Sequence, residues 1–136
     1  MFLRLLARDA EVRSKVLEEQ KQALKAREEN GGKLGWSDVQ MMKYTWRVSQ
    51  ELMRMTPPVF GNFKRTSRDI SFGGFHIPKG WQIMWVTSPT HMDEKIFSEP
   101  EKFDPSRFEN PRSIPPYAYI PSSGPSDLPW GRFCPD

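Results

Sequence analysis

Several features that would narrow the function at once are scarce in this sequence. Its 136 residues include a single cysteine, Cys134, so an internal disulfide framework is excluded and the thiol indicates either a reducing compartment or a metal ligand. Lys and Arg number 20 against 17 Asp and Glu, an excess too small to indicate nucleic-acid binding. No stretch approaches the ~18 apolar residues of a membrane span. The initial MFLRLLA, interrupted by Arg4, is too short for a signal peptide, so we expect no membrane anchor in this sequence.

Proline is missing from the first 56 residues, and all 13 prolines follow that point. Because proline ends helices and marks turns, this asymmetry predicts helices first and a turn-rich second half. The first expected helix covers residues 10–29, where Asp9 is placed to cap the N-terminus and the ENGG run ends the helix. Its apolar face is expected to consist of Val12, Val16, Leu17, Ala23 and Leu24.

Two further helices are expected before the first proline. WSDVQ predicts a short helix in which Ser37 and Gln40 have the spacing of a capping box. A longer helix is predicted over residues 43–55, and the TPP sequence ends it. Its apolar stripe is expected to consist of Tyr44, Val48, Leu52 and Met55.

The second half predicts short strands followed by loops. FKRTS, ISF, FHI and WQIMWVT are candidate strands, with turns at GG and PKG. In the last of them Trp81, Ile83 and Trp85 occupy alternate positions, as in a half-buried strand. Short helical turns and loops are expected from residue 88, and no regular element over 111–136.

Two charged motifs stand out. In ELMR, Glu51 and Arg54 are three residues apart on a helix and can pair, which by itself indicates an ordinary surface ion pair. In FDPSRF, Arg107 lies in a proline-fixed loop between two phenylalanines. Guanidinium groups are well suited to bridging carboxylates. Together the motifs therefore predict that Arg107 reaches back to Glu51, giving a network of Glu51, Arg54 and Arg107.

The order of these motifs resembles the cytochrome P-450 family of haem-thiolate monooxygenases. An E-x-x-R helix followed by PP, hairpins containing G-x-x-I-P-K-G, and then THMDEKIFSEPEKFDPSRF correspond to the family's K helix, small sheet and meander. The stretch KYTWRVSQELMRMTPPVFGNFK is most similar to plant triterpenoid oxidases, such as beta-amyrin oxidases, and to taxane hydroxylases. The resemblance extends from about Phe2 to Tyr119.

This resemblance implies an α+β fragment of a predominantly helical fold. Residues 1–136 would be a partial domain with a helical part at 10–56, a small antiparallel sheet at 57–87, a meander at 88–119 and a degenerate, irregular haem-loop region at 120–136.

The resemblance also implies roles for individual residues, none of them catalytic. Glu51, Arg54 and Arg107 would hold the meander so that the haem loop is placed correctly. Cys134 would be the axial thiolate of the haem iron, a ligand that favours O–O cleavage. Arg132 and Lys64 would be haem-binding cations, although Lys64 is equally explained as an exposed strand lysine.

The sequence also suggests a place or a role for three further residues. His91 is expected to be structural rather than a metal ligand, and His76 to lie on a strand surface. Phe60 would line the parent enzyme's substrate cavity by resemblance, while the simpler interpretation is a buried core aromatic.

The region around Cys134 departs from the family pattern F-x-x-G-x-R-x-C-x-G. Asp127 stands at the phenylalanine position, and Trp130 and Asp136 stand at the two glycine positions. Glycine allows the backbone to approach the haem closely, so these residues predict poor haem binding by this chain alone. A shifted reading frame, an unspliced intron or a decayed gene copy would each produce such a departure near Ser122.

The resemblance implies a haem monooxygenase that oxidises a hydrophobic terpenoid or sterol-like substrate with O₂. Electrons would come from an NADPH-cytochrome reductase, and the parent enzyme would lie on the cytosolic face of the endoplasmic reticulum membrane. The alternatives are a non-catalytic remnant, truncated or derived from a pseudogene, and a small module that binds a protein partner.

Overall fold

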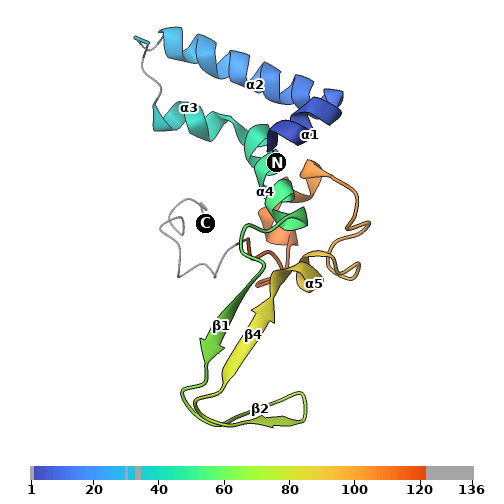
Figure 1. The fold of residues 1–136 in the computed structure, drawn as a ribbon. Helices are drawn as coiled ribbons and strands as arrows, with labels where there is room; N and C mark the ends of the chain where they lie inside the picture. The colour runs from blue at the N-terminus through green and yellow to red at the C-terminus, as the bar shows by residue number, and fades with distance from the viewer. Residues whose placement is uncertain (1, 30, 33–34, 122–136) are drawn as a thin grey trace. The chain divides into compact units, whose positions relative to one another are not determined.

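The structure is a computed structural model that describes residues 2–29, 31–32 and 35–121. The elements follow the chain in the order α1 (Phe2–Arg8), α2 (Ala10–Glu29), α3 (Trp36–Met41), α4 (Lys43–Met55), β1 (Gly61–Arg65), β2 (Ile70–Phe72), β3 (Phe75–Ile77), β4 (Gln82–Val86), α5 (Thr87–His91), and the 3₁₀ turns η1 (Pro105–Phe108) and η2 (Pro111–Ser113) (Figure 1).

The described residues form two compact units. The first comprises those in the ranges Met1–Met53 and Lys102–Ser113, and the second those in Arg54–Glu101 and Ile114–Asp136. The division falls inside α4, between Glu51 and Arg54, so the two ends of the E-x-x-R motif belong to different units.

The predicted helix over 10–29 is confirmed as α2, and its cap is the predicted one. Asp9 Oδ1 accepts hydrogen bonds from the amides of Glu11 and Val12, at 3.1 and 3.0 Å, which satisfies two donors of the first turn. The preceding helix, α1, was not predicted, because MFLRLLA was interpreted only as a possible signal peptide.

The core of the first unit is built on α2 and α4. Val12, Val16 and Val48 are buried together, and the partly buried residues packed against them are Leu6, Tyr44 and Phe103. The expected apolar face of α2 is wrong in part, since Leu17 and Leu24 are 52% and 50% exposed. Each of them directly follows a buried residue, Val16 or Ala23, so its side chain points away from the narrow buried stripe of the helix.

The short helix α3 has its N-cap two residues earlier than predicted, at Gly35 rather than Ser37. Asp38, not Gln40, reaches back, and its Oδ2 accepts from the Gly35 amide at 2.7 Å. The predicted capping box between Ser37 and Gln40 is therefore wrong, because the N-cap position is occupied by Gly35.

The predicted helix over 43–55 is confirmed as α4, and Val48 on its predicted stripe is fully buried. Its first turn is capped from α2: Glu19 accepts from the amides of Tyr44 and Thr45 and from the Thr45 hydroxyl, each at 2.7 Å. A carboxylate at a helix N-terminus also interacts favourably with the helix dipole.

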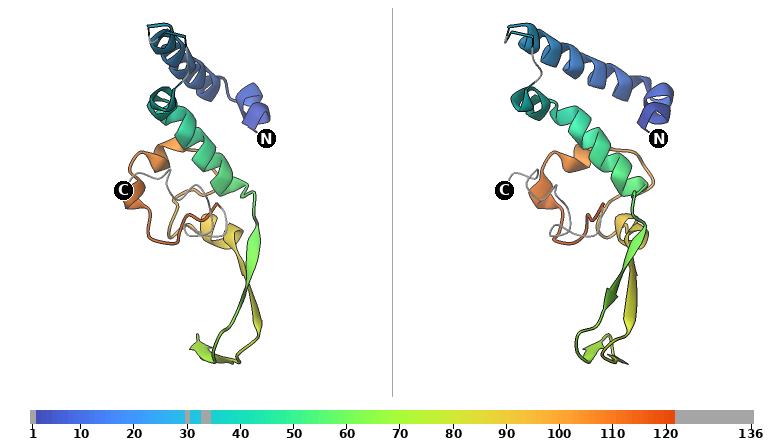
Figure 2. Two further views of the ribbon diagram at one scale, coloured as in Figure 1. Left: turned by 90° about the vertical axis from the view of Figure 1, so that its left-hand side faces the viewer. Right: turned by 60° about the vertical axis from the view of Figure 1, so that its left-hand side comes forward.

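The small sheet consists of two antiparallel ladders, β1 with β4 and β2 with β3 (Figure 1 and Figure 2). All four predicted strands are present within a residue or two of their expected ends. Trp81 precedes β4 and is 61% exposed, so its expected half-buried position is wrong, whereas Ile83 and Trp85 are half-buried as predicted. A short 3₁₀ turn at Pro111–Ser113 also lies where no regular element was expected.

The β1–β4 ladder requires glycine at its start. A Cβ atom on Gly61 would collide with the backbone oxygen of Trp85, so any larger residue would push the strands apart. Within the described ranges, none of the helices combines the length and the apolar content that a membrane crossing needs.

Candidate functional site

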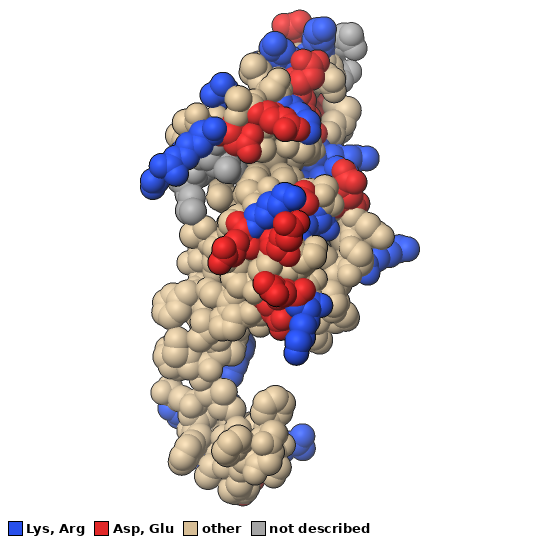
Figure 3. Space-filling view, turned by 90° about the vertical axis from the view of Figure 1, so that its right-hand side faces the viewer, with Lys and Arg blue, Asp and Glu red and all other residues tan. Residues whose placement is uncertain are grey.

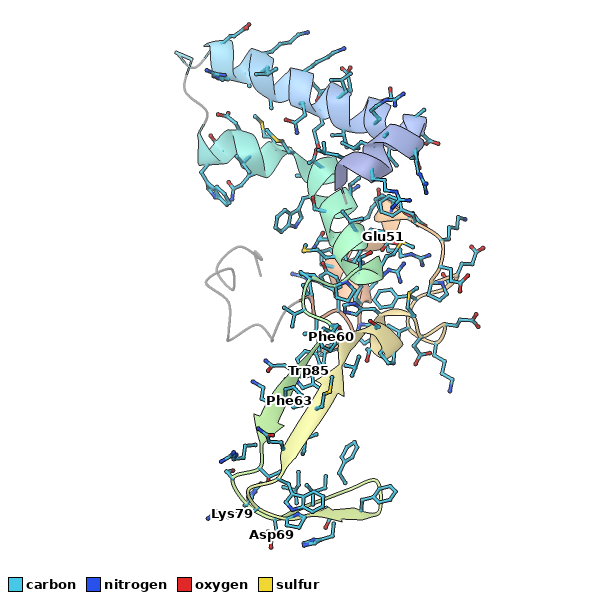
Figure 4. The ribbon with its side chains drawn as sticks, in the orientation of Figure 1. Glu51, Phe60, Phe63, Asp69, Lys79 and Trp85 are labelled. Carbon is cyan, nitrogen blue, oxygen red and sulfur yellow. The ribbon has the colours of Figure 1, made fainter. Side chains whose placement is uncertain are left out.

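Glu51 on α4 is fully buried in the first unit (Figure 4). Its Oε1 accepts from the Asp104 amide at 3.0 Å and forms an ion pair with Arg107 Nε at 3.4 Å. The Arg107 side chain is itself only 10% exposed. The structure therefore brings these two members of the predicted network together.

The local sequence D-P-S-R explains how Arg107 is positioned. Asp104 caps η1 by accepting from the amide and the hydroxyl of Ser106, at 3.0 and 2.6 Å, and Pro105 supplies a fixed φ at the first position of the turn. The Ser106 hydroxyl bond is the main reason that the pKa of Asp104 lies below its usual value. A capped turn holds Arg107 toward Glu51 at little entropic cost.

Arg54 is also fully buried, within the second unit. Its Nη1 donates to the carbonyl of His91 at 2.7 Å and its Nη2 to the carbonyl of Pro100 at 2.6 Å. The guanidinium lies over the ring of Phe97, 5.2 Å from its centroid. A single arginine thus joins the end of α4 to two points of the segment 91–100.

His91 completes this arrangement in the second unit. Its Nδ1 lies 3.0 Å from the carbonyl of Arg54, and its Nε2 accepts from the Ile120 amide at 2.9 Å. Because Nε2 accepts, Nδ1 must carry the proton and donate, so the ring is neutral. Burial is the main reason that its pKa lies below the ordinary 6.5, and the charge of Arg54 lowers it further. The ring of Tyr119 stacks on it with centroids 5.6 Å apart.

The interpretation of E-x-x-R as an ordinary surface ion pair is wrong, because Glu51 and Arg54 are both inaccessible to solvent. His91, which was expected to be structural, is buried and hydrogen-bonded through both ring nitrogens, but neither its burial nor its contact with Ile120 was predicted. The sequence signal for burial of His91 was weak: it follows an apolar strand and precedes an acidic turn. Nothing in the sequence indicates that its partner lies 29 residues away.

The remaining predicted residues of the second unit lie on its surface. Lys64 on β1 and His76 on β3 are exposed, as is Phe60, of which 64% is accessible, so its interpretation as a buried core aromatic is wrong. Cys134 and Arg132 lie outside the described residues. Within the part of the chain that the structure describes, no cluster of three or more His, Cys, Asp or Glu side chains could hold a metal ion.

The family model for Cytochrome P450 matches residues 1–125. The chain is 43% identical over 134 residues to a beta-amyrin 28-monooxygenase of Barbarea vulgaris, covering 98% of this chain and 27% of that protein. It is 42% identical over 125 residues to a taxane 10-beta-hydroxylase of Taxus cuspidata, covering 91% of this chain and 25% of the relative.

Among solved structures, the retinoic acid-bound cyanobacterial CYP120A1 matches with a TM-score of 0.77 and 36% identity, over 90% of this chain and 28% of that chain. The fold is therefore that of part of a P450. The chain spans about a quarter of the length of these relatives.

Proposed function

The chain belongs to the cytochrome P450 family, and we propose that it forms part of a haem-dependent monooxygenase that oxidises a hydrophobic terpenoid or sterol-like substrate. One atom of O₂ would enter a C–H bond, and the other would leave as water with two protons and two electrons. An NADPH-cytochrome reductase would supply the electrons at the cytosolic face of the endoplasmic reticulum. The support for this substrate class is that the chain is similar to a beta-amyrin 28-monooxygenase and to a taxane 10-beta-hydroxylase.

The observation that carries the proposal is the burial of both charged residues of the E-x-x-R motif. Glu51 holds the turn that contains Arg107, and Arg54 holds the segment from His91 to Pro100. An unpartnered buried charge costs several kcal/mol, so losing either set of contacts would be strongly unfavourable. Each buried charge therefore holds its segment firmly in place. We propose that these contacts position the chain that leads to Cys134.

The cofactor implied by the family is haem, and the available donors fit it in chemical type. The thiol of Cys134 is the type of donor that would hold the haem iron, and the cations of Lys64 and Arg132 would match the haem carboxylates in charge. Bound haem would supply the activation of O₂. The residues of this chain would hold the haem and keep its surrounding segments in place.

Carbonyl spectroscopy tests the proposal. Purified chain mixed with haem, reduced and exposed to carbon monoxide should give the red-shifted band of a thiolate complex. Cys134→Ser should abolish that band, and the matched variant His76→Ala, which removes an exposed histidine, should retain it. Absence of the band in the unaltered chain would contradict haem–thiolate binding by this chain.

A non-catalytic protein is the second candidate, and Trp130 and Asp136 at the expected glycine positions favour it. Cooperative thermal unfolding without haem would support a partner-binding module. Broad, non-cooperative melting would support a remnant. Sequencing the transcript across residues 120–136 would show whether a glycine-bearing haem loop is encoded in another frame.

A further inference from the structure

His91 joins the end of α4 to the last described residues of the chain. It is the final residue of α5, and its side chain is fully buried. Its carbonyl accepts from Arg54 Nη1 and its Nδ1 donates to the Arg54 carbonyl, so two hydrogen bonds fix the residue to Arg54. The other ring nitrogen, Nε2, accepts from the Ile120 amide at 2.9 Å. The ring therefore sets the position of that amide relative to α4.

The segment that reaches Ile120 contains a strained residue. The Ala118 amide donates to the Pro115 carbonyl at 3.1 Å and closes a four-residue turn. Tyr117, at the third position of this turn, has a φ of 64°, in the left-handed region that favours glycine. A bulky residue keeps such a conformation only where the surrounding contacts enforce it, and residues strained in this way cluster at functional sites.

The residues after Tyr117 supply that constraint. Ala118 is buried, and the ring of Tyr119 stacks on His91 with the centroids 5.6 Å apart. The Ile120 amide then bonds to the same ring. Two consecutive residues thus contact one histidine directly after the strained turn, so His91 is placed to keep the turn and the chain that follows it in position.

This contact differs in kind from the charged interactions on the surface. On the face shown in Figure 3, acidic and basic side chains lie beside one another, where water and salt screen them. The His91 ring is neutral and inaccessible to solvent, so its bond to the Ile120 amide depends on geometry and not on ionic strength. Such a bond is suited to holding one backbone position.

We propose that His91 is a positioning residue, whose Nε2 fixes Ile120 and thereby the point from which the chain continues toward Cys134. Arg54 acts on a different segment, since its guanidinium binds the carbonyls of His91 and Pro100. The inference rests on the proposed function in taking Cys134 as the haem ligand. The anchoring of Ile120 by His91 does not depend on haem and is tested separately.

Two amide side chains separate the two bonds of the ring. Asparagine places its amide nitrogen near the position of Nδ1 and can donate to the Arg54 carbonyl, but it is too short to meet the Ile120 amide. Glutamine is one methylene longer, and its carbonyl oxygen can accept from the Ile120 amide near the position of Nε2. His91→Asn and His91→Gln therefore lose one bond each, and only His91→Asn loses the anchor of Ile120.

Hydrogen exchange of the Ile120 amide, followed by NMR in the whole chain without haem, tests the anchor. The Thr66 amide, which donates to the Trp81 carbonyl at 3.0 Å, is the internal reference for general loosening. We expect the ratio of the Ile120 rate to the Thr66 rate to rise at least about tenfold in His91→Asn and less than about threefold in His91→Gln. An equal rise in both variants, a larger rise in His91→Gln, or no rise in either contradicts the proposal.

Carbonyl spectroscopy connects the anchor to the haem. In chain mixed with haem, reduced and exposed to carbon monoxide, His91→Asn should lose most of the red-shifted thiolate band, and His91→Gln should keep most of it. His76→Asn, which replaces an exposed histidine on β3, should change neither the band nor the exchange ratio.

The two readouts distinguish failure of the inference from failure of the proposed function. A full thiolate band in His91→Asn would overturn the positioning role toward Cys134. A missing band in the unaltered chain would contradict the proposed function, and with it that role, while the exchange ratios would still decide whether His91 fixes Ile120.

Discussion

The buried charged and polar side chains on α4 and α5 and the exposed β2–β3 hairpin invert the usual distribution of residues. The largest fully buried side chains among the described residues include Arg54, His91 and Glu51, all of them polar or charged. The β2–β3 hairpin exposes its phenylalanines instead, with Phe72 and Phe75 more than 70% accessible. Buried charges are tolerated only when they are partnered, whereas exposed side chains make few contacts within the chain. The first region therefore contributes strongly to stability, and the second contributes little.

The largest effect is expected when the buried centre loses its guanidinium. Arg54→Ala leaves the carbonyls of His91 and Pro100 without their buried donor, and we expect the free energy of unfolding to fall by ~3–5 kcal/mol. Urea denaturation followed by circular dichroism measures this. The matched control is Arg47→Ala, whose ion pair with Glu109 is partly exposed, with an expected loss of about 1 kcal/mol or less. Equal losses in the two variants would show that burial does not increase the contribution of Arg54 to the free energy of unfolding.

A smaller loss is expected at Glu51. Glu51→Gln keeps the shape but removes the charge that faces Arg107, and should lower the free energy of unfolding by ~2–3 kcal/mol. Glu109→Gln, on a side chain that is 61% exposed, should change it by no more than about 1 kcal/mol. A double-mutant cycle with Arg107→Met isolates the pair, and a coupling energy near zero would contradict a working ion pair.

The third prediction concerns pH. The pKa of folded His91 is lowered, so the unfolded chain binds the proton more readily. Its stabilising contribution is therefore fully present above the ordinary pKa of 6.5 and is lost as pH falls toward the lowered folded value. Between about pH 7 and about pH 5, the unaltered chain should lose more stability than His91→Asn. The exposed His76→Asn should retain the pH dependence, and its disappearance there would assign the effect to the wrong histidine.

The smallest effect on stability is expected at the β2–β3 hairpin. Phe72→Ser with Phe75→Ser should change the free energy of unfolding by no more than about 0.5 kcal/mol per site, because both rings are already exposed. Thermal unfolding without lipid measures this. A loss of several kcal/mol would show that the pair packs within the chain, and would remove the contrast between the two regions.

Much of the fold could be predicted because its signals are local. Asp9, the ENGG run and the TPP sequence set the ends of α2 and α4, and the glycine turns set the strands. The features that were predicted wrongly are those for which neighbouring residues offer competing alternatives. Gly35 and Asp38 replaced the expected Ser37 and Gln40 as the cap of α3, since two overlapping caps differ by only a fraction of the ~1 kcal/mol that a cap contributes.

The candidate site was predicted in part, for a different reason. The ion pair between Glu51 and Arg107 was anticipated from residue types, because guanidinium and carboxylate are complementary wherever the chain brings them together. The bonds of Arg54 to backbone carbonyls and of His91 to Ile120 were not anticipated. Every residue offers the same backbone groups, so a carbonyl or amide partner leaves no mark on the sequence.

The sequence by itself determined the order and type of most of the elements and the family, because periodicity, caps, motifs and composition are written along the chain. Only the tertiary structure decided that charged side chains are buried. Glu51 and Arg54 read as surface residues until partners 37, 46 and 53 positions away remove them from water. Burial of a charged side chain depends on such distant contacts, whereas helix and strand propensities depend on neighbours, which is why the first could not be predicted and the second could.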